Sequence, residues 1–117
     1  EITVKKVVMQ DGIQFVEGYA FYKCTSLEEI VFSDSIVSFG EWPLFDCDGL
    51  TELRLPKNLQ QITKCISNGC DNIVRAYLPD HLDTISSYPV GGSNQIQYIC
   101  ALRSPTAASL TELGLKC

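Results

Sequence analysis

The sequence of 117 residues has no long apolar run, few basic residues and almost no histidine. A membrane-spanning helix needs about 18 or more consecutive apolar residues, and no segment reaches that length. Nine Lys and Arg residues stand against 14 Asp and Glu without forming a basic cluster, which argues against binding to a nucleic-acid backbone. A single histidine and the lack of a Cys-x-x-Cys pair argue against a zinc site.

Residues arranged for catalysis are equally scarce. His81 lies between Asp80 and Asp83 in an expected turn, and a solvated histidine explains this position better than a catalytic triad does. The pair Gly91-Gly92 lacks the Lys and Ser or Thr that complete a phosphate-binding loop. We therefore expect neither an enzyme active site nor a cofactor.

What the sequence does contain is a repeat with a step of 23 residues. One column consists of Cys24, Cys47 and Cys70. Five apolar columns keep the same step: Leu27, Leu50, Ile73 and Ile96; Ile30, Leu53, Ala76 and Ile99; Phe32, Leu55, Leu78 and Ala101; Ile13, Ile36, Leu59 and Leu82; and Val16, Phe39, Ile62 and Ile85. One such unit cannot bury its apolar face alone, so we expect the units to stack around a shared core.

Within each unit, apolar residues alternate with a period of two, which predicts a short β-strand. The strands are expected near residues 4–9, 27–32, 50–55, 73–78 and 96–101, in one parallel sheet along a right-handed coil. Residues 1–101 then form five repeat units. Residues 102–117 form either a C-terminal helical cap, with Ser104 as N-cap and Pro105 in the first turn, or a degenerate sixth unit.

The segments that follow the expected strands carry a more specific pattern. The first two read Val16-Glu17-Gly18-Tyr19-Ala20-Phe21-Tyr22-Lys23-Cys24 and Phe39-Gly40-Glu41-Trp42-Pro43-Leu44-Phe45-Asp46-Cys47. With the Cys-x-x-Leu-x-x-Ile pattern that continues them, these units resemble the BspA-like leucine-rich repeats over roughly residues 4–101. The resemblance implies a leucine-rich repeat coil, an α/β-type solenoid with one parallel sheet and irregular or short-helical returns.

The resemblance also implies a function. BspA-like proteins are bacterial-type surface proteins, so we expect a non-catalytic adhesion module, secreted or on the cell surface, whose partner is a protein or glycan of a host or neighbouring cell. A purely structural spacer and an intracellular interaction scaffold are the alternatives. The chain begins at Glu1 without Met or a signal peptide, which favours a piece of a longer protein.

The cysteine column is expected to stay reduced. Equivalent positions on neighbouring coils lie about 4.7–4.9 Å apart, whereas the Cβ atoms of a disulfide lie roughly 3.5–4.5 Å apart. Cys65 shares a column with aromatic residues and should pack inside. Cys100 falls on an outward strand position in this register, and Cys117 gives no indication.

Outward strand positions offer one candidate binding surface. Three neighbouring strands bring together Arg54, Arg75, Tyr77 and Tyr98. Tyr and Arg are enriched in the hot spots of protein interfaces. On a chain with a net charge of −5, two exposed guanidinium groups would attract an acidic protein or glycan.

Overall fold

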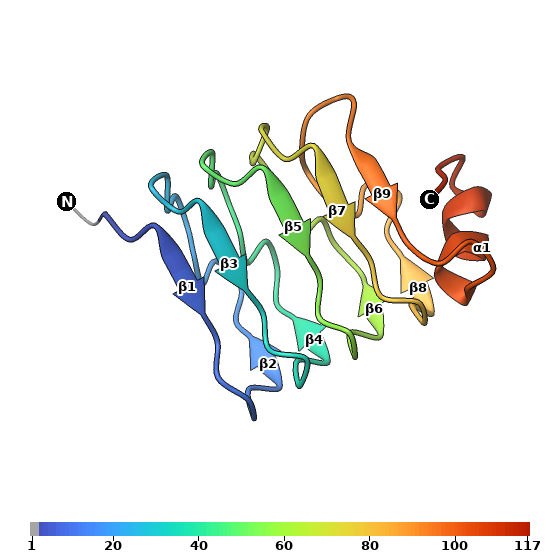
Figure 1. Cartoon of the computed structure of the whole chain (residues 1–117), viewed down its shortest axis with the longest axis horizontal. Helices are drawn as coiled ribbons and strands as arrows, with labels where there is room; N and C mark the ends of the chain where they lie inside the picture. The colour runs from blue at the N-terminus through green and yellow to red at the C-terminus, as the bar shows by residue number, and fades with distance from the viewer. Residues whose placement is uncertain (1–2) are drawn as a thin grey trace.

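The computed structural model describes residues 3–117, so the first two residues of the predicted repeat segment 1–101 lie outside the described part. These described residues wind into a coil that measures 43 × 33 × 20 Å, with a single helix at its C-terminal end (Figure 1). Successive turns stack along the long direction, which confirms the predicted repeat solenoid.

One side of the coil is a ladder of short parallel strands, one from each turn. These are β1 (Lys6–Val8), β3 (Glu29–Val31), β5 (Glu52–Arg54), β7 (Arg75–Tyr77) and β9 (Gln97–Ile99). Strand β1 pairs with β3 in one sheet, and β5, β7 and β9 pair in another. The pairs Lys6–Glu29 and Glu52–Arg75 keep the 23-residue step of the sequence. We call these five strands the front ladder.

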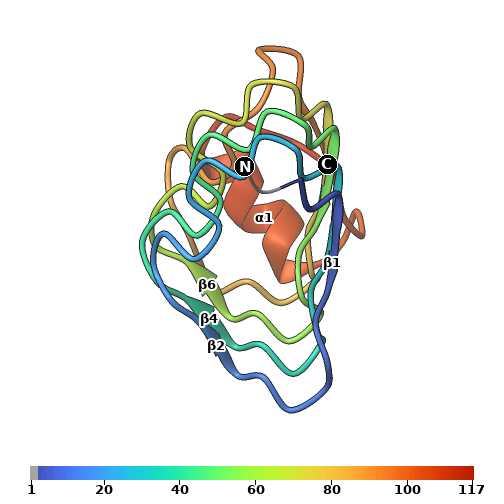
Figure 2. The same ribbon diagram turned by 90° about the vertical axis from the view of Figure 1, so that its left-hand side faces the viewer.

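Each of the first four turns also contributes a second strand of two residues. These are β2 (Phe15–Val16), β4 (Ser38–Phe39), β6 (Gln61–Ile62) and β8 (Thr84–Ile85). They pair in parallel, β2 with β4 and β6 with β8, on a different side of the coil from the front ladder (Figure 2). This second ladder follows one of the apolar columns, so the structure adds strands to a column that the sequence analysis assigned only to the core.

The apolar columns fill the interior of the coil. Leu50, Leu53 and Ile62 are almost completely buried, and full burial of such a side chain stabilises the fold by roughly 1.5–3 kcal/mol. The three cysteines of the column are free thiols, as predicted; Cys47 and Cys70 lie in the same core, and Cys24 is partly buried against it. The buried members of the column bond to the preceding turn: the thiol of Cys47 donates to the carbonyl of Phe21 at 3.0 Å, and that of Cys70 donates to Leu44 at 3.1 Å.

The last strand departs from the 23-residue register. Ala76 pairs with Tyr98 across β7 and β9, a step of 22 residues. Tyr98 therefore points inward and is 7% exposed, whereas Ile99, predicted for a core column, is 38% exposed. The expected outward position of Tyr98 is wrong, and the small Ala76 beside it gives a physical reason, since it leaves room for the larger ring. Burial raises the pKa of the Tyr98 phenol to about 12.

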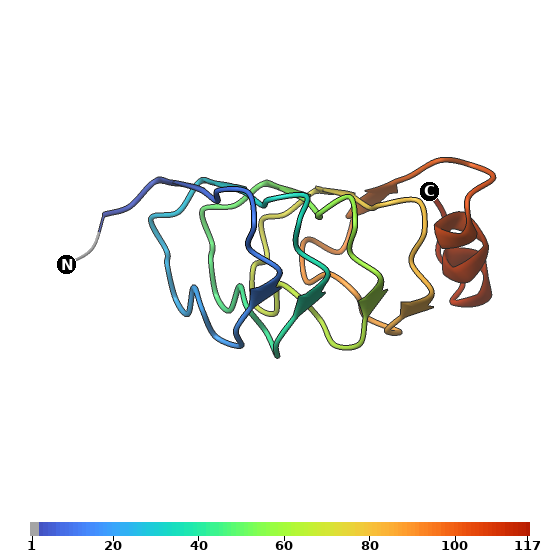
Figure 3. The ribbon, with the colours of Figure 1, turned by 90° about the horizontal axis from the view of Figure 1, so that it is seen from below.

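A short helix, α1 (Pro105–Glu112), covers the C-terminal end of the coil (Figure 3). Ser104 caps it, because its hydroxyl accepts a hydrogen bond from the amide of Ala107. The buried hydroxyl of Thr106 fastens the helix to the fourth turn: it donates to the carbonyl of Pro79 and accepts from the amide of Leu82. Of the two alternatives for residues 102–117, the structure contains the helix.

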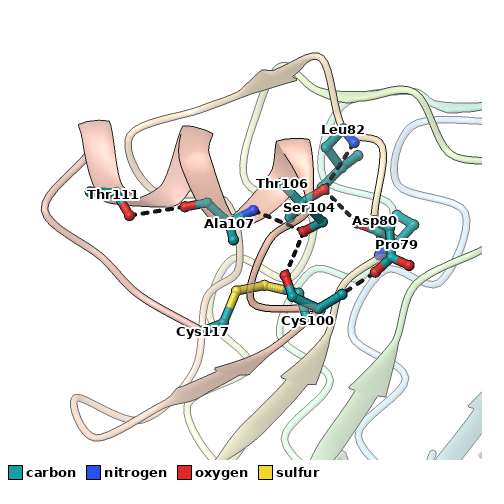
Figure 4. Close-up of a disulfide and its surroundings, with 10 residues drawn as sticks. Pro79, Asp80, Leu82, Cys100, Ser104, Thr106, Ala107, Thr111 and Cys117 are labelled. Atoms are coloured by element: carbon teal, nitrogen blue, oxygen red, sulfur yellow. Dashed lines mark hydrogen bonds between the residues drawn. A yellow bond between two sulfur atoms is a disulfide. The ribbon is translucent and has the colours of Figure 1, made fainter.

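A disulfide joins Cys100, just after β9, to Cys117 (Figure 4). Their Cα atoms are 5.4 Å apart, and the bond closes a loop of 17 residues around α1. The register shift in β9 explains it, because the shift turns Cys100 away from the outer face, where it was expected, and toward the tail. Cys65 is a buried free thiol, as its column predicted.

Candidate functional site

The outer face of β5 and β7 carries a stacked pair of predicted site residues. Arg54 and Tyr77 are register partners on the two strands. The guanidinium carbon of Arg54 lies 3.8 Å from the centre of the Tyr77 ring. Such a cation–π contact contributes about 0.5–1 kcal/mol at an exposed site. The contact holds two large side chains in a fixed arrangement on rigid strands, which lowers the entropy lost when a partner binds.

Arg75 lies beside this pair but is engaged within the protein. Its Nη2 and Nε donate to the same carboxylate oxygen of Glu52, at 2.6 Å and 2.9 Å. This hydrogen-bonded carboxylate raises the pKa of the Arg75 guanidinium, so Arg75 stays charged. Arg75 therefore faces outward as predicted, but its charge is balanced by Glu52 and does not attract an acidic partner as an isolated cation would.

A shallow groove of about 680 Å³ runs next to the Arg54–Tyr77 pair, where the front ladder divides between β3 and β5. It is lined by the outer residues of these strands and by the loops after β3, β5 and β7. Its charged lining residues are Glu28, Glu29, Asp34, Glu52 and Asp80 on the acidic side and Arg54 and Lys57 on the basic side. The surface is thus not the positive patch that the sequence analysis expected, because its acidic lining residues outnumber the basic ones.

Tyr98, the fourth predicted residue, lies inside the coil and does not join this surface. The structure thus brings together three of the four predicted residues, Arg54, Arg75 and Tyr77, on adjacent strands. We call Arg54, Tyr77 and the adjoining groove the front site.

A second surface was missed by the sequence analysis. Four aromatic side chains touch one another on the segments that lead from β2 to β3 and from β4 to β5; we call them the aromatic cluster: Tyr19, Tyr22, Trp42 and Phe45. The sequence contained a signal for this cluster, because the aromatic residues of the second turn, Trp42 and Phe45, follow those of the first turn by the repeat step of 23 residues.

The described part of the chain has neither a cluster of metal ligands nor a membrane-spanning helix. Among residues 3–117, no group of His, Cys, Asp and Glu side chains is placed to hold a metal ion. The helix of this same region is too short to cross a bilayer.

Comparison with protein families gives one match. Residues 1–110 are similar to the family described as BspA type leucine rich repeat region, in six copies. The matched region covers the front ladder, the second ladder and most of α1. Neither a curated protein nor a solved structure matches the chain.

Proposed function

The chain belongs to the family of BspA-type leucine-rich repeats, and on this premise we propose that it is a protein-recognition module of a longer secreted or cell-surface protein. Leucine-rich repeats of this family are repeat modules suited to interaction and generally lack catalytic activity. Stacked repeats present side chains on an extended, rigid surface, which suits recognition of a large partner. Adhesion to a host or neighbouring cell is the role we assign to that surface.

The front site is the observation that carries this proposal. Arg54 and Tyr77 are already held against each other, and both residue types dominate binding energy in protein interfaces. Most of the charged residues that line the groove beside them are carboxylates. The matching partner is a protein surface that offers a carboxylate to Arg54 and one or two basic side chains to the groove. This is a mixed pattern, in contrast to the purely acidic partner expected from the sequence.

The cysteines support a location outside the cytosol. Disulfides form and persist mainly in oxidising compartments, such as the cell surface and the secreted space. The Cys100–Cys117 bond fits that setting, and three of the remaining thiols, Cys47, Cys65 and Cys70, are buried where an oxidant has little access. This combination favours the secreted or surface module over the intracellular scaffold.

A binding experiment tests the front site. An array of extracellular protein domains, probed with the labelled chain, supplies a partner for affinity measurements. Arg54→Ala and Tyr77→Ala should each weaken that binding about fivefold or more, the size of a hot-spot truncation. Lys5→Ala, an exposed position at the N-terminal end of the same coil, should bind like the parent.

Two results would count against the proposal. If the Arg54 and Tyr77 variants bind the partner as tightly as the parent, recognition uses another face. If the chain binds no extracellular domain at all, the structural spacer becomes the better account of the fold.

A further inference from the structure

The last strand of the front ladder, β9, has an open backbone edge. Gln97 donates its amide hydrogen to the carbonyl of Val74 at 2.9 Å, toward β7. The carbonyl of Ile99 accepts from the amide of Leu78, also at 2.9 Å. Because neighbouring residues of a strand direct their backbone groups to opposite edges, the N–H and C=O of Tyr98 point away from β7. In the described part of the chain these two groups have no backbone partner.

The helical cap leaves this edge uncovered. Helix α1 packs against β8, which belongs to the second ladder, and within residues 3–117 it makes no close backbone contact with β9. The helix lies beyond the last turn of the coil, and β9 lies to one side of it (Figures 1 and 3). An edge strand presents unpaired backbone groups that can pair with another chain. The cap thus closes the core of the coil but not the end of the front ladder.

A groove of about 740 Å³ adjoins this edge; we call it the β9 groove. Its lining includes Tyr98 and Ile99 of β9 and, from the tail that follows α1, Leu115 and Lys116. The disulfide described above holds this tail at the end of β9 (Figure 4). The volume falls in the range of roughly 300–1,000 Å³ that is usual for ligand-binding sites. The open backbone edge therefore lies in a formed groove and not on a flat surface.

The backbone of the β9 groove selects an extended segment of another chain. An exposed strand edge is matched by the backbone of an added strand, which supplies the complementary C=O and N–H groups. A second copy of the coil meets an obstacle, because α1 projects beyond β9 along the long direction of the coil (Figure 3). The helix keeps the end of another coil from reaching this edge. A single strand of five or six residues, about 17–20 Å long, passes beside it.

The lining side chains narrow the choice of peptide. Lys116 is exposed and is the only charged side chain that lines the groove, so an acidic residue in the peptide complements it. Ile99 and Leu115 offer apolar surface to the β-branched residues that are typical of strands. We propose that the β9 groove binds an extended, acidic peptide segment of another protein as an added strand of the front ladder. The groove shares no lining residue with the front site, so either proposal can fail while the other stands.

A peptide library tests this proposal with a defined probe. Heptapeptides displayed on phage are selected on the oxidised chain, and the selected peptides are synthesised for affinity measurements. They should bind in a saturable way and carry Asp or Glu among β-branched residues. Lys116→Glu should weaken this binding about threefold or more. Lys5→Glu, the same charge reversal at an exposed lysine near the opposite end of the coil, should bind like the parent.

Amide hydrogen exchange shows whether the bound peptide is an added strand. In the free chain, the Tyr98 amide should exchange faster than the Gln97 amide, because only the latter donates into the ladder. A bound peptide should slow the exchange of Tyr98 about tenfold or more and leave that of Gln97 nearly unchanged. Contact through side chains alone would not produce this difference between neighbouring residues.

Methylation of single backbone nitrogens in the peptide gives a matched control within the probe itself. The peptide residue that donates to the carbonyl of Tyr98 loses that hydrogen bond when it is methylated, and the affinity should fall about tenfold or more. The residues on either side of it direct their N–H groups away from β9. Methylation of those residues should have a much smaller effect, so the loss of affinity should alternate along the peptide.

Three results would overturn the proposal. The first is that no heptapeptide binds the chain in a saturable way. The second is that the selected peptides slow amide exchange elsewhere on the coil and leave Tyr98 unprotected. The third is that the chain alone forms dimers in sedimentation experiments and its Tyr98 amide becomes protected as the concentration rises, which would make a second copy the occupant of the β9 groove.

Discussion

The disulfide around α1 should be the strongest single constraint on the C-terminal end of the coil. We consider Cys117→Ser, because this terminal residue is partly exposed and its loss removes little packing. The bond closes a loop of 17 residues, and the entropy that such a loop removes from the unfolded chain corresponds to roughly 3 kcal/mol at 25 °C. The variant should therefore be less stable than the parent by about that amount.

Urea unfolding with and without a reductant measures this effect. The other four cysteines are free thiols, so a reductant acts only on the Cys100–Cys117 bond. It should lower the free energy of unfolding of the parent to that of Cys117→Ser and leave the variant unchanged. If the reduced parent unfolds within about 0.5 kcal/mol of the oxidised parent, the constraint has little effect on the unfolded chain and the loop argument is refuted.

Three further predictions concern the core, one ionisable group and the backbone. Leu53→Ala should cost about 2–5 kcal/mol in a urea melt, and Thr51→Ala on the outer face should cost less than about 0.5 kcal/mol; equal costs would contradict the register. Stability should fall by up to about 3 kcal/mol between pH 10 and 12, since the Tyr98 phenol ionises near 10 when unfolded and at about 12 when folded. Below pH 10 the stabilisation linked to the protonated Tyr98 phenol is fully present. In urea melts at a series of pH values, Tyr98→Phe should remove most of the fall in stability. Lys23→Gly should raise stability by about 0.5–1 kcal/mol. Lys23 has a positive φ of 53°, and Gly69 occupies the equivalent position two turns later. A lower melting temperature of the variant would contradict this.

The repeat could be predicted from the sequence because its physical cause is local and periodic. Ile30, Leu53 and Ala76 are buried because each of these turns places an apolar side chain at the same level of the shared core. The register of β9 could not be predicted in the same way. Tyr98 and Ile99 are both apolar enough to point inward, so hydrophobicity alone does not show that one residue is missing from the last turn.

Contacts between distant segments of the chain also could not be predicted from the sequence. The Cys100–Cys117 bond depends on α1 folding back against the end of the coil, and neither cysteine belongs to a repeating column. For the front site, the register placed Arg54 beside Tyr77, as the structure has them. The charge of the groove could not be read from strand positions, because part of it comes from loop residues such as Asp34 and Asp80.

The disulfide also decides how the module carries a mechanical load. A force applied at Cys117 passes through the sulfur atoms directly to Cys100 and into β9, so the intervening residues bear no tension. With the bond closed, α1 is shielded from stretching, and the front ladder is the first part to resist. With the bond reduced, the released segment of 17 residues can extend by roughly 55–60 Å. In a protein exposed to shear, this covalent bypass would keep the end of the coil from peeling open under flow.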